Sequence, residues 1–187
     1  DYIENLNSNP FFKTNNLSLV RYVYKDPIYD FIWLGADSDG LFRVDIKNKG
    51  SIKDFKVNQF VNDKINKRSI SSNFVTSVIR LPNDELWIGT EGGGICKVVK
   101  SDTEPEFISF SEKHGLSNNV VKSIMYDDEN NLWVAKNVGL NKFNTKEQRF
   151  RRFGVSDGLP FEDFWFSSEK LDNGYFLFSG LDGFCYF

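Results

Sequence analysis

The chain has 187 residues with a formal net charge of −3, and 16% of its residues are aromatic. That length is enough for one domain with a hydrophobic core, and the abundance of aromatic residues and glycine favours strands and turns over helices. Charges of both signs are interspersed, which argues against a nucleic-acid partner. A helix needs about 20 apolar residues to cross a bilayer, and no apolar run in the sequence approaches that length. Because the chain begins at Asp1 without an initiator methionine, we expect a processed chain or a piece of a longer protein.

Four units with the same pattern follow one another along the chain. Each has a short apolar motif around an aromatic residue, and a glycine follows within a few residues. In chain order these motifs are IWLG at 32–35, LWIGT at 86–90, LWVA at 132–135 and YFLF at 175–178. The upstream parts also match, with LSLV at 17–20, ISSNFV at 70–75, LSNNVV at 116–121 and LPFEDF at 159–164.

The third unit shows how each repeat is built. Residues 121–126 and 132–135 are apolar and β-rich, and the polar residues 127–131 between them predict a hairpin turn. Residues 140–143 predict a third strand after a glycine turn, and 150–153 alternate apolar and polar residues as a half-exposed outer strand does. Four short strands per unit, at a period of roughly 40–50 residues, are typical of β-propeller blades.

We therefore predict an all-β protein of about four four-stranded antiparallel propeller blades, at residues 17–60, 70–110, 116–153 and 159–187. A β-sandwich would not explain why tryptophan and glycine recur at the same phase of each unit. The phase of Trp33, Trp87 and Trp133 predicts that these side chains pack between blades rather than bind sugars.

The pattern LSxNxV…LWIGT…GGI resembles the two-component regulator propeller repeat. The likeness is clearest at residues 70–98 and 114–143, and it extends over nearly the whole chain from Leu17 onward. It implies an extracytoplasmic sensor domain of a hybrid histidine kinase and response regulator, periplasmic and anchored in the inner membrane of a Gram-negative bacterium. It also implies that the domain detects oligosaccharides, that it is not itself an enzyme, and that the kinase and the membrane segments lie outside this chain.

The same resemblance implies a ring of seven blades, of which four would be part. An open arc of blades exposes apolar surface, so we expect self-association as a homodimer, closure as a four-bladed ring, or completion by further blades. The last unit lacks an outer strand. Residues 9–15 are predicted to be a strand that either completes this unit or belongs to a preceding blade.

Ligands of propellers usually bind on the face that carries the connections between blades and the turns between the second and third strands. An oligosaccharide or another polar ligand suits the side chains expected there. The predicted ligand-binding residues are Asp37, Asp39, Glu91, Lys136, Asn137, Asp163, Trp165 and Asp182. Trp165 is expected to face the central channel. The alternative function is a protein-interaction scaffold without a small-molecule ligand.

The remaining reactive residue types do not form a catalytic or metal-binding motif, and no cofactor is expected. His114 is the single histidine and is predicted to lie in a loop. Cys96 and Cys185 follow equivalent glycines in units two repeats apart, so we expect two buried free thiols rather than a disulfide. Residues 127–131 resemble a calcium loop in spacing but match the ordinary hairpin of the other units, and the glycines at 92–94 match a strand turn rather than a phosphate loop.

Overall fold

The computed structural model describes residues 8–15, 17–47 and 50–187. Within them the chain forms four antiparallel sheets in sequence order, each a simple meander. The first three sheets have four strands and the last has three. The strands are β1 (Val20–Lys25), β2 (Phe31–Ala36), β3 (Leu41–Asp45) and β4 (Lys56–Phe60); β5 (Val75–Arg80), β6 (Leu86–Thr90), β7 (Gly94–Val99) and β8 (Glu106–Phe110); β9 (Val121–Tyr126), β10 (Leu132–Lys136), β11 (Leu140–Asn144) and β12 (Arg149–Phe153); and β13 (Phe164–Lys170), β14 (Phe176–Gly180) and β15 (Gly183–Tyr186).

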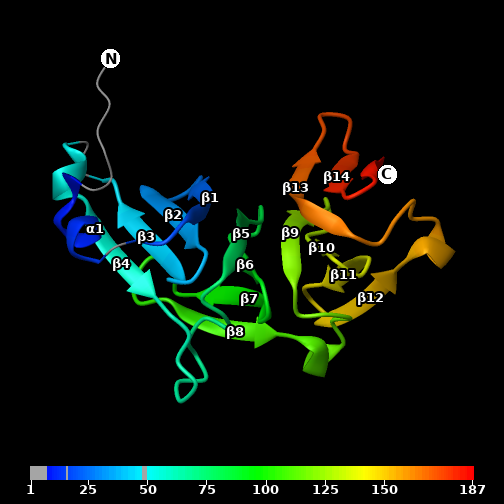
Figure 1. The fold of residues 1–187 in the computed structure, drawn as a ribbon, viewed down its shortest axis with the longest axis horizontal. Coiled ribbons are helices and arrows are strands. Elements are labelled where there is room, and N and C mark those ends of the chain that lie inside the picture. Colours follow the sequence, from blue (N-terminus) through cyan, green and yellow to red (C-terminus); the bar gives the residue numbers. More distant parts are fainter. Residues whose placement is uncertain (1–7, 16, 48–49) are drawn as a thin grey trace.

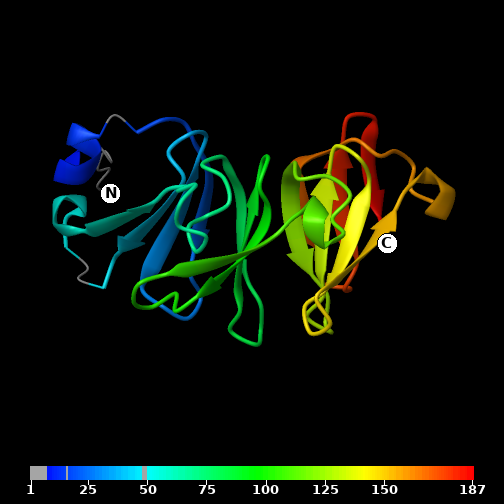
Figure 2. The ribbon, with the colours of Figure 1, turned by 90° about the horizontal axis from the view of Figure 1, so that it is seen from below.

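The sheets are blades of a propeller, which confirms the predicted fold class. Figure 1 shows them arranged along an arc, with β1, β5, β9 and β13 on its inner side and β4, β8 and β12 on its outer side. Consecutive inner strands contact one another. In Figure 2 the first blade (blue and cyan) lies at one end, and the strands of the last blade (red) lie partly behind those of the third (yellow). No helix among the described residues is long and apolar enough to cross a membrane.

The hydrophobic core is divided among the spaces between neighbouring blades. Trp33 belongs to the cluster between blades 1 and 2, and Trp87 to the cluster between blades 2 and 3. Trp133 packs against the cluster between blades 3 and 4. These positions confirm the prediction that the three tryptophans pack between blades. Cys96 and Cys185 are free and buried, also as predicted.

The glycine of the repeated motif is required by the close approach of the next blade. A Cβ added at Gly89 would lie 2.3 Å from Ser77 Oγ and 2.8 Å from Val121 Cγ1. A Cβ added at Gly35 would lie 2.8 Å from Val75 Cγ1. Val75 and Val121 begin the inner strands of the following blades. The motif therefore specifies contact between blades as well as a strand.

The prediction of a strand at residues 9–15 is wrong, because this segment contains helix α1 (Pro10–Thr14). The Asn9 side chain accepts a hydrogen bond from Phe11 N (3.0 Å), and Pro10 occupies the first turn, where its missing N–H costs little. Phe12 is buried against the ring of Phe42, with the ring centroids 5.9 Å apart. The helix thus covers the outer face of blade 1 and adds no strand to the last blade.

Among the described residues, three single-turn 3₁₀ helices occur in the connections between strands. Two of them, η3 (Glu112–His114) and η4 (Val155–Asp157), lie in the connections that enter blades 3 and 4. The other, η2 (Ile52–Asp54), precedes β4. His114 therefore lies in a connection between blades, as predicted from its sequence context.

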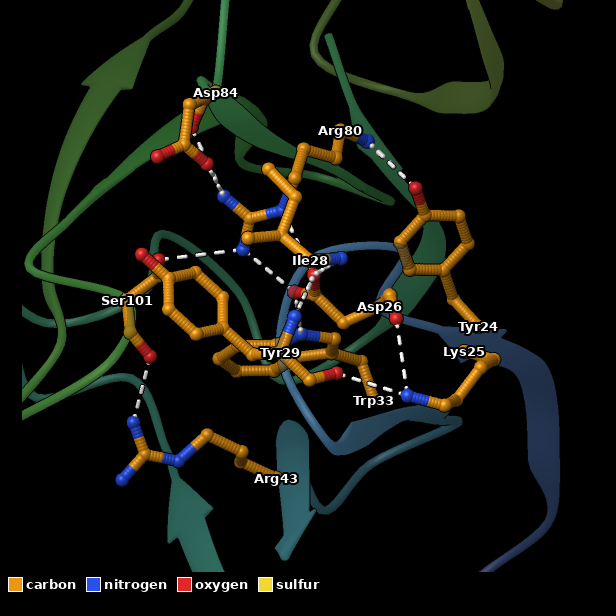
Figure 3. A network of polar contacts seen from close by, with 10 residues as sticks. All are labelled: Tyr24, Lys25, Asp26, Ile28, Tyr29, Trp33, Arg43, Arg80, Asp84 and Ser101. Atoms are coloured by element: carbon orange, nitrogen blue, oxygen red, sulfur yellow. Dashed lines mark hydrogen bonds and ion pairs between the residues drawn. The ribbon is translucent and has the colours of Figure 1, made fainter. Parts of the chain in front are cut away.

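A buried ion pair joins blades 1 and 2. Asp26 follows β1 and Arg80 ends β5, and their side chains are 0% and 1% exposed. Arg80 Nη2 lies 2.5 Å from Asp26 Oδ2, and Arg80 Nε donates to Asp26 Oδ1 at 3.0 Å. Trp33 Nε1 also donates to this carboxylate, at 3.0 Å. Figure 3 shows Asp26 at the centre of these donors, with Asp84 on the far side of the guanidinium.

The electrostatic balance at Asp26 favours the charged carboxylate. Burial by itself raises the pKa of an aspartate, but the hydrogen bonds from Arg80 and Trp33 outweigh it, and the pKa of Asp26 is lowered below its ordinary value of 3.8. The folded protein therefore binds this proton less readily than the unfolded chain. The stabilisation is present above pH 3.8 and is lost as the pH falls through the lower, folded-state pKa.

Asp26→Asn should lower the free energy of unfolding by about 3 kcal/mol, because it removes the buried counter-charge of Arg80 and leaves the guanidinium with only the exposed carboxylate of Asp84. Urea unfolding at pH 7 and at pH 3 measures this, and the variant should lose less stability on acidification than the parent. Asp84→Asn is the matched control. Asp84 contacts the same guanidinium (2.7 Å) but is 55% exposed, so its loss should cost less than about 1 kcal/mol. Equal effects of the two substitutions would contradict the assignment.

Candidate functional site

A β-bulge lies near the start of each of the first three inner strands. Val20 pairs with Ala36 and Tyr22 with Gly35, so Arg21 is an extra residue without a cross-strand partner. The same register shift leaves Thr76 unpaired in β5 and Lys122 unpaired in β9. A bulge redirects a side chain that would otherwise alternate with the strand.

Two of these bulged side chains converge with residues from every blade. Arg21 Nε donates to Asp37 Oδ1 at 2.7 Å, and Lys122 forms an ion pair with Glu91. Lys122 Nζ lies 4.5 Å, and the Arg21 guanidinium 5.7 Å, from the ring centroid of Phe166 on β13. The Arg21 guanidinium also lies 4.7 Å from the ring of Phe74. We call this set the inner cluster: Arg21, Asp37, Phe74, Glu91, Lys122 and Phe166.

A cavity of about 200 Å³ lies beside the inner cluster and is lined by all four inner strands. Ser77 and Ser123 line it, and their buried hydroxyl groups have no hydrogen-bond partner among the described residues. Tyr22 on β1 and Glu169 on β13 also line it. Burial, and secondarily the charge of Glu169, raises the pKa of Tyr22, so its phenol stays protonated and able to donate a hydrogen bond.

The chemistry available here suits a hydroxylated ligand. The inner cluster offers two cations and two carboxylates in pairs, with an aromatic ring beside each cation. The hydroxyl groups of the cavity can both donate and accept. The Arg21 hydrogen bond to Asp37 raises the pKa of the guanidinium, which is therefore a permanent cation.

The structure brings together only two of the sequence-predicted ligand residues in this cluster, Asp37 and Glu91. Asp39, in the turn between β2 and β3, accepts a hydrogen bond from Ser18 N (2.6 Å), which fixes this turn to the segment before β1. Asn137, Asp163 and Asp182 are exposed in other connections. Trp165 is 52% exposed and does not line the cavity, whereas Phe166, the next residue, does.

The sequence predicts that Lys136 contacts a ligand, but the structure buries its side chain completely. Its ammonium group donates to Ser117 Oγ and lies 3.4 Å from the carbonyl oxygen of Val138. Ser117 in turn donates to Asn141 Oδ1 at 2.9 Å. Burial, with a smaller contribution from the charge of Arg152, lowers the pKa of Lys136 to about 8. A ligand on the surface of the blade would not reach this amine without moving it.

Sequence reasoning missed Arg21, Lys122, Phe74 and Phe166. One signal was present: Arg21 and Lys122 occupy the same place, directly after the first valine of their strands. In β5 that place holds Thr76, whose buried hydroxyl group has no described partner. A polar residue at the second position of an apolar inner strand therefore indicates a bulge. Its convergence with residues of other blades could not be predicted from the repeat alone.

Lys136→Met should raise the free energy of unfolding at pH 7 by about 2 kcal/mol, because it removes the cost of burying a charge that has no carboxylate partner among the described residues. Between pH 8, the folded-state pKa, and 10.5, the ordinary value, the unfolded chain holds a proton that the folded protein has released. The parent should therefore gain stability as the pH rises through this window. Urea unfolding at pH 7 and pH 10 measures both effects. A variant that is less stable at pH 7, or keeps the rise with pH, would contradict the prediction.

Comparison with known proteins identifies the repeat. The family model for the two component regulator propeller matches residues 69–92 and 115–135. Histidine kinase P4 of Formosa agariphila is 38% identical over 88 residues, which are 43% of this chain and 6% of the kinase.

Solved structures with similar folds include two large bacterial surface proteins. One is described as the extracellular domain of a hybrid two component system from B. thetaiotaomicron, with a TM-score of 0.66, 20% identity, and coverage of 86% of this chain and 22% of that chain. The other is PorZ, a surface component of the type-IX secretion system of Porphyromonas gingivalis, with a TM-score of 0.70, 19% identity, and coverage of 92% of this chain and 26% of that chain.

These likenesses show the fold, and this chain spans less than a third of the length of each of these proteins. The matched residues 69–92 and 115–135 contain the blade entry, the inner strand and the tryptophan motif of blades 2 and 3. They include three residues of the inner cluster, Phe74, Glu91 and Lys122. In these segments the chain is similar to the two component regulator propeller repeat.

Proposed function

We propose that this domain is an extracytoplasmic, periplasmic sensor that binds an oligosaccharide at the inner cluster. The observation that carries the proposal is the convergence of Arg21, Lys122 and Phe166 from three blades beside a cavity with unpaired buried hydroxyl groups. Sugar rings present an apolar face that packs on aromatic rings and hydroxyl groups that bond to paired charges.

The signalling step belongs to the same proposal. Residues of all four blades meet at the inner cluster, so a ligand there would bind most tightly to one angle between the blades. A change in that angle would pass to the segments that continue the chain in family members, and through the membrane to a histidine kinase. In this proposal the domain binds and transmits but catalyses no reaction.

Phe166→Ala should weaken the binding of the recognised oligosaccharide at least tenfold, because it removes the aromatic surface shared by Arg21 and Lys122. Isothermal titration against a panel of oligosaccharides measures the affinity. Trp165→Ala is the matched control, since this neighbouring aromatic side chain is exposed and does not line the cavity. Equal losses in both variants, or no binding by any oligosaccharide, would refute the inner cluster as the sensing site. In a membrane-anchored receptor carrying this domain, Phe166→Ala should also abolish ligand-dependent kinase activity.

We also propose that two copies of the domain associate through blade 4. Trp165, Phe184 and Tyr186 are 52%, 64% and 65% exposed on this blade. At the other end of the arc, helix α1 covers the outer face of blade 1. An exposed aromatic surface of this kind marks interaction sites.

Tyr186→Lys should turn the dimer into a monomer, because two copies would bring like charges together in the apolar contact. Sedimentation velocity over a tenfold range of concentration measures the change. Ile65→Lys is the control, since Ile65 is 90% exposed in a loop of another part of the chain. A parent protein that is monomeric at every concentration would contradict the proposed dimer.

A further inference from the structure

A second cleft lies on the connection side of the blades, apart from the inner cluster. It has a volume of about 530 Å³, within the range of small-molecule sites. One wall is the connection that enters blade 2, residues 62–71, and the other is the connection that enters blade 3, residues 109–119. Gly92 and Gly93, in the turn between β6 and β7, form its floor. No residue of the inner cluster lines it.

The described side chains that line the cleft all belong to polar residues, and their summed formal charge is positive. Its described lining residues are asparagine, serine, glycine, lysine, one aspartate and one histidine, with no aliphatic side chain. Lys64 and Lys67 lie on one wall and Lys113 on the other, and none of the three forms an ion pair with a described carboxylate. Asp63 is the single acidic residue in the described part of the lining, so the local formal charge is positive in a chain whose total charge is −3.

The first wall is held in place by its own side chains. Asn62 Nδ2 donates to Ile70 O at 2.7 Å, which closes the loop on itself. Ser69 Oγ accepts from Asp63 N (2.9 Å) and donates to Asp63 O (3.0 Å). Lys67 Nζ donates to the backbone carbonyl oxygen of Lys64 at 3.1 Å, which holds the Lys67 side chain against this loop. A preformed wall loses little conformational entropy when a ligand binds.

The second wall and the floor are fixed to each other through Asn119. Its carbonyl oxygen accepts from Gly92 N and Gly94 N, both at 3.0 Å. Its side chain accepts from Glu112 N (2.9 Å), and its own N–H donates to Glu112 Oε1 (3.0 Å). Glu112 is thereby engaged with the backbone next to Lys113. His114 Nδ1 accepts from Ser111 N at 3.0 Å, so a neutral imidazole carries its proton on Nε2 and offers a donor.

The floor leaves space that a side chain would fill. A Cβ added at Gly92 would meet no atom within 4 Å, whereas one added at Gly93 would lie 2.4 Å from Ser71 Oγ. Gly92 has a φ of +92°, a conformation that glycine and, less readily, asparagine adopt. Bare backbone at this point lets a ligand lie directly against the turn.

We propose that this cleft is an anion-selective saccharide site, which takes a short oligosaccharide that carries carboxylate or sulfate groups. The lysines on the two walls would bind the acidic groups, and the amide and hydroxyl groups of the asparagines and serines would bind the sugar hydroxyls. A ligand bound across both walls would link the connections that enter blades 2 and 3. The site does not depend on binding at the inner cluster.

The test is titration of the protein, by calorimetry, with four ligands of similar size: a diuronate, a sulfated disaccharide, a neutral disaccharide and a hexaglutamate peptide. The diuronate or the sulfated disaccharide should bind at least tenfold more tightly than the neutral one, and the affinity should fall as sodium chloride is raised. Comparison of the first two identifies the acidic group. Tighter binding of the peptide than of either sugar, or equal binding of the neutral disaccharide, would overturn the proposal.

Variants locate the binding. The double variant Lys64→Gln, Lys67→Gln and the single variant Lys113→Gln should each weaken the acidic sugar at least fivefold. Gly92→Asn should do the same without changing any charge, because its side chain occupies the floor. Lys146→Gln is the control, since Lys146 is an exposed lysine in the turn between β11 and β12.

Two further measurements separate this proposal from folding defects and from the proposed function. The midpoint of thermal unfolding of each variant should match that of the parent without ligand. Phe166→Ala, which removes the aromatic ring of the inner cluster, should leave the affinity for the acidic sugar unchanged. An acidic sugar that loses affinity with Phe166→Ala but not with the lysine variants would place its binding at the inner cluster and overturn the second site.

Discussion

Contact between neighbouring blades is the constraint on which the rest of this structure depends. A single four-stranded sheet exposes two faces and cannot bury both by itself, so each blade is stable only against its neighbours. Trp33 and Trp87 are the largest fully buried side chains at the first two contacts, and Gly35 and Gly89 let the next inner strand approach. The recurring tryptophan and glycine are therefore two parts of one interaction, a large side chain and the space beside it.

The same packing buries two charged side chains, and the loss of their hydration is offset by their pairing with each other. Tight contact between blades 1 and 2 removes Asp26 and Arg80 from water, and each is buried together with the other. Removing one partner of such a pair is costly, because it leaves the other charge buried and uncompensated. Lys136 is the opposite case, because it is buried without a described carboxylate, and its lowered pKa reflects that.

Binding chemistry follows from how the inner strands begin. The bulges turn Arg21 and Lys122 away from the strand alternation, and the angle between blades brings both toward Phe166. The polar cleft has a different origin, since it lies where two connections between blades pass the turn at Gly92. Both sites are formed by more than one blade, so a ligand at either would be sensitive to the angle between blades.

The sequence by itself determined the strands, their order, the positions of the tryptophans and the free cysteines, because these depend on a local pattern repeated in phase. It did not reveal helix α1, whose five residues are too few to be stable alone and depend on Phe12 packing against Phe42. Nor did it place Lys136 inside the blade or Phe166 rather than Trp165 beside the cavity. One extra residue in a strand changes which side chain points inward, and no periodicity records it. The tertiary structure alone decided which polar residues meet, since they come from different blades and are brought together only by the angle at which the blades pack.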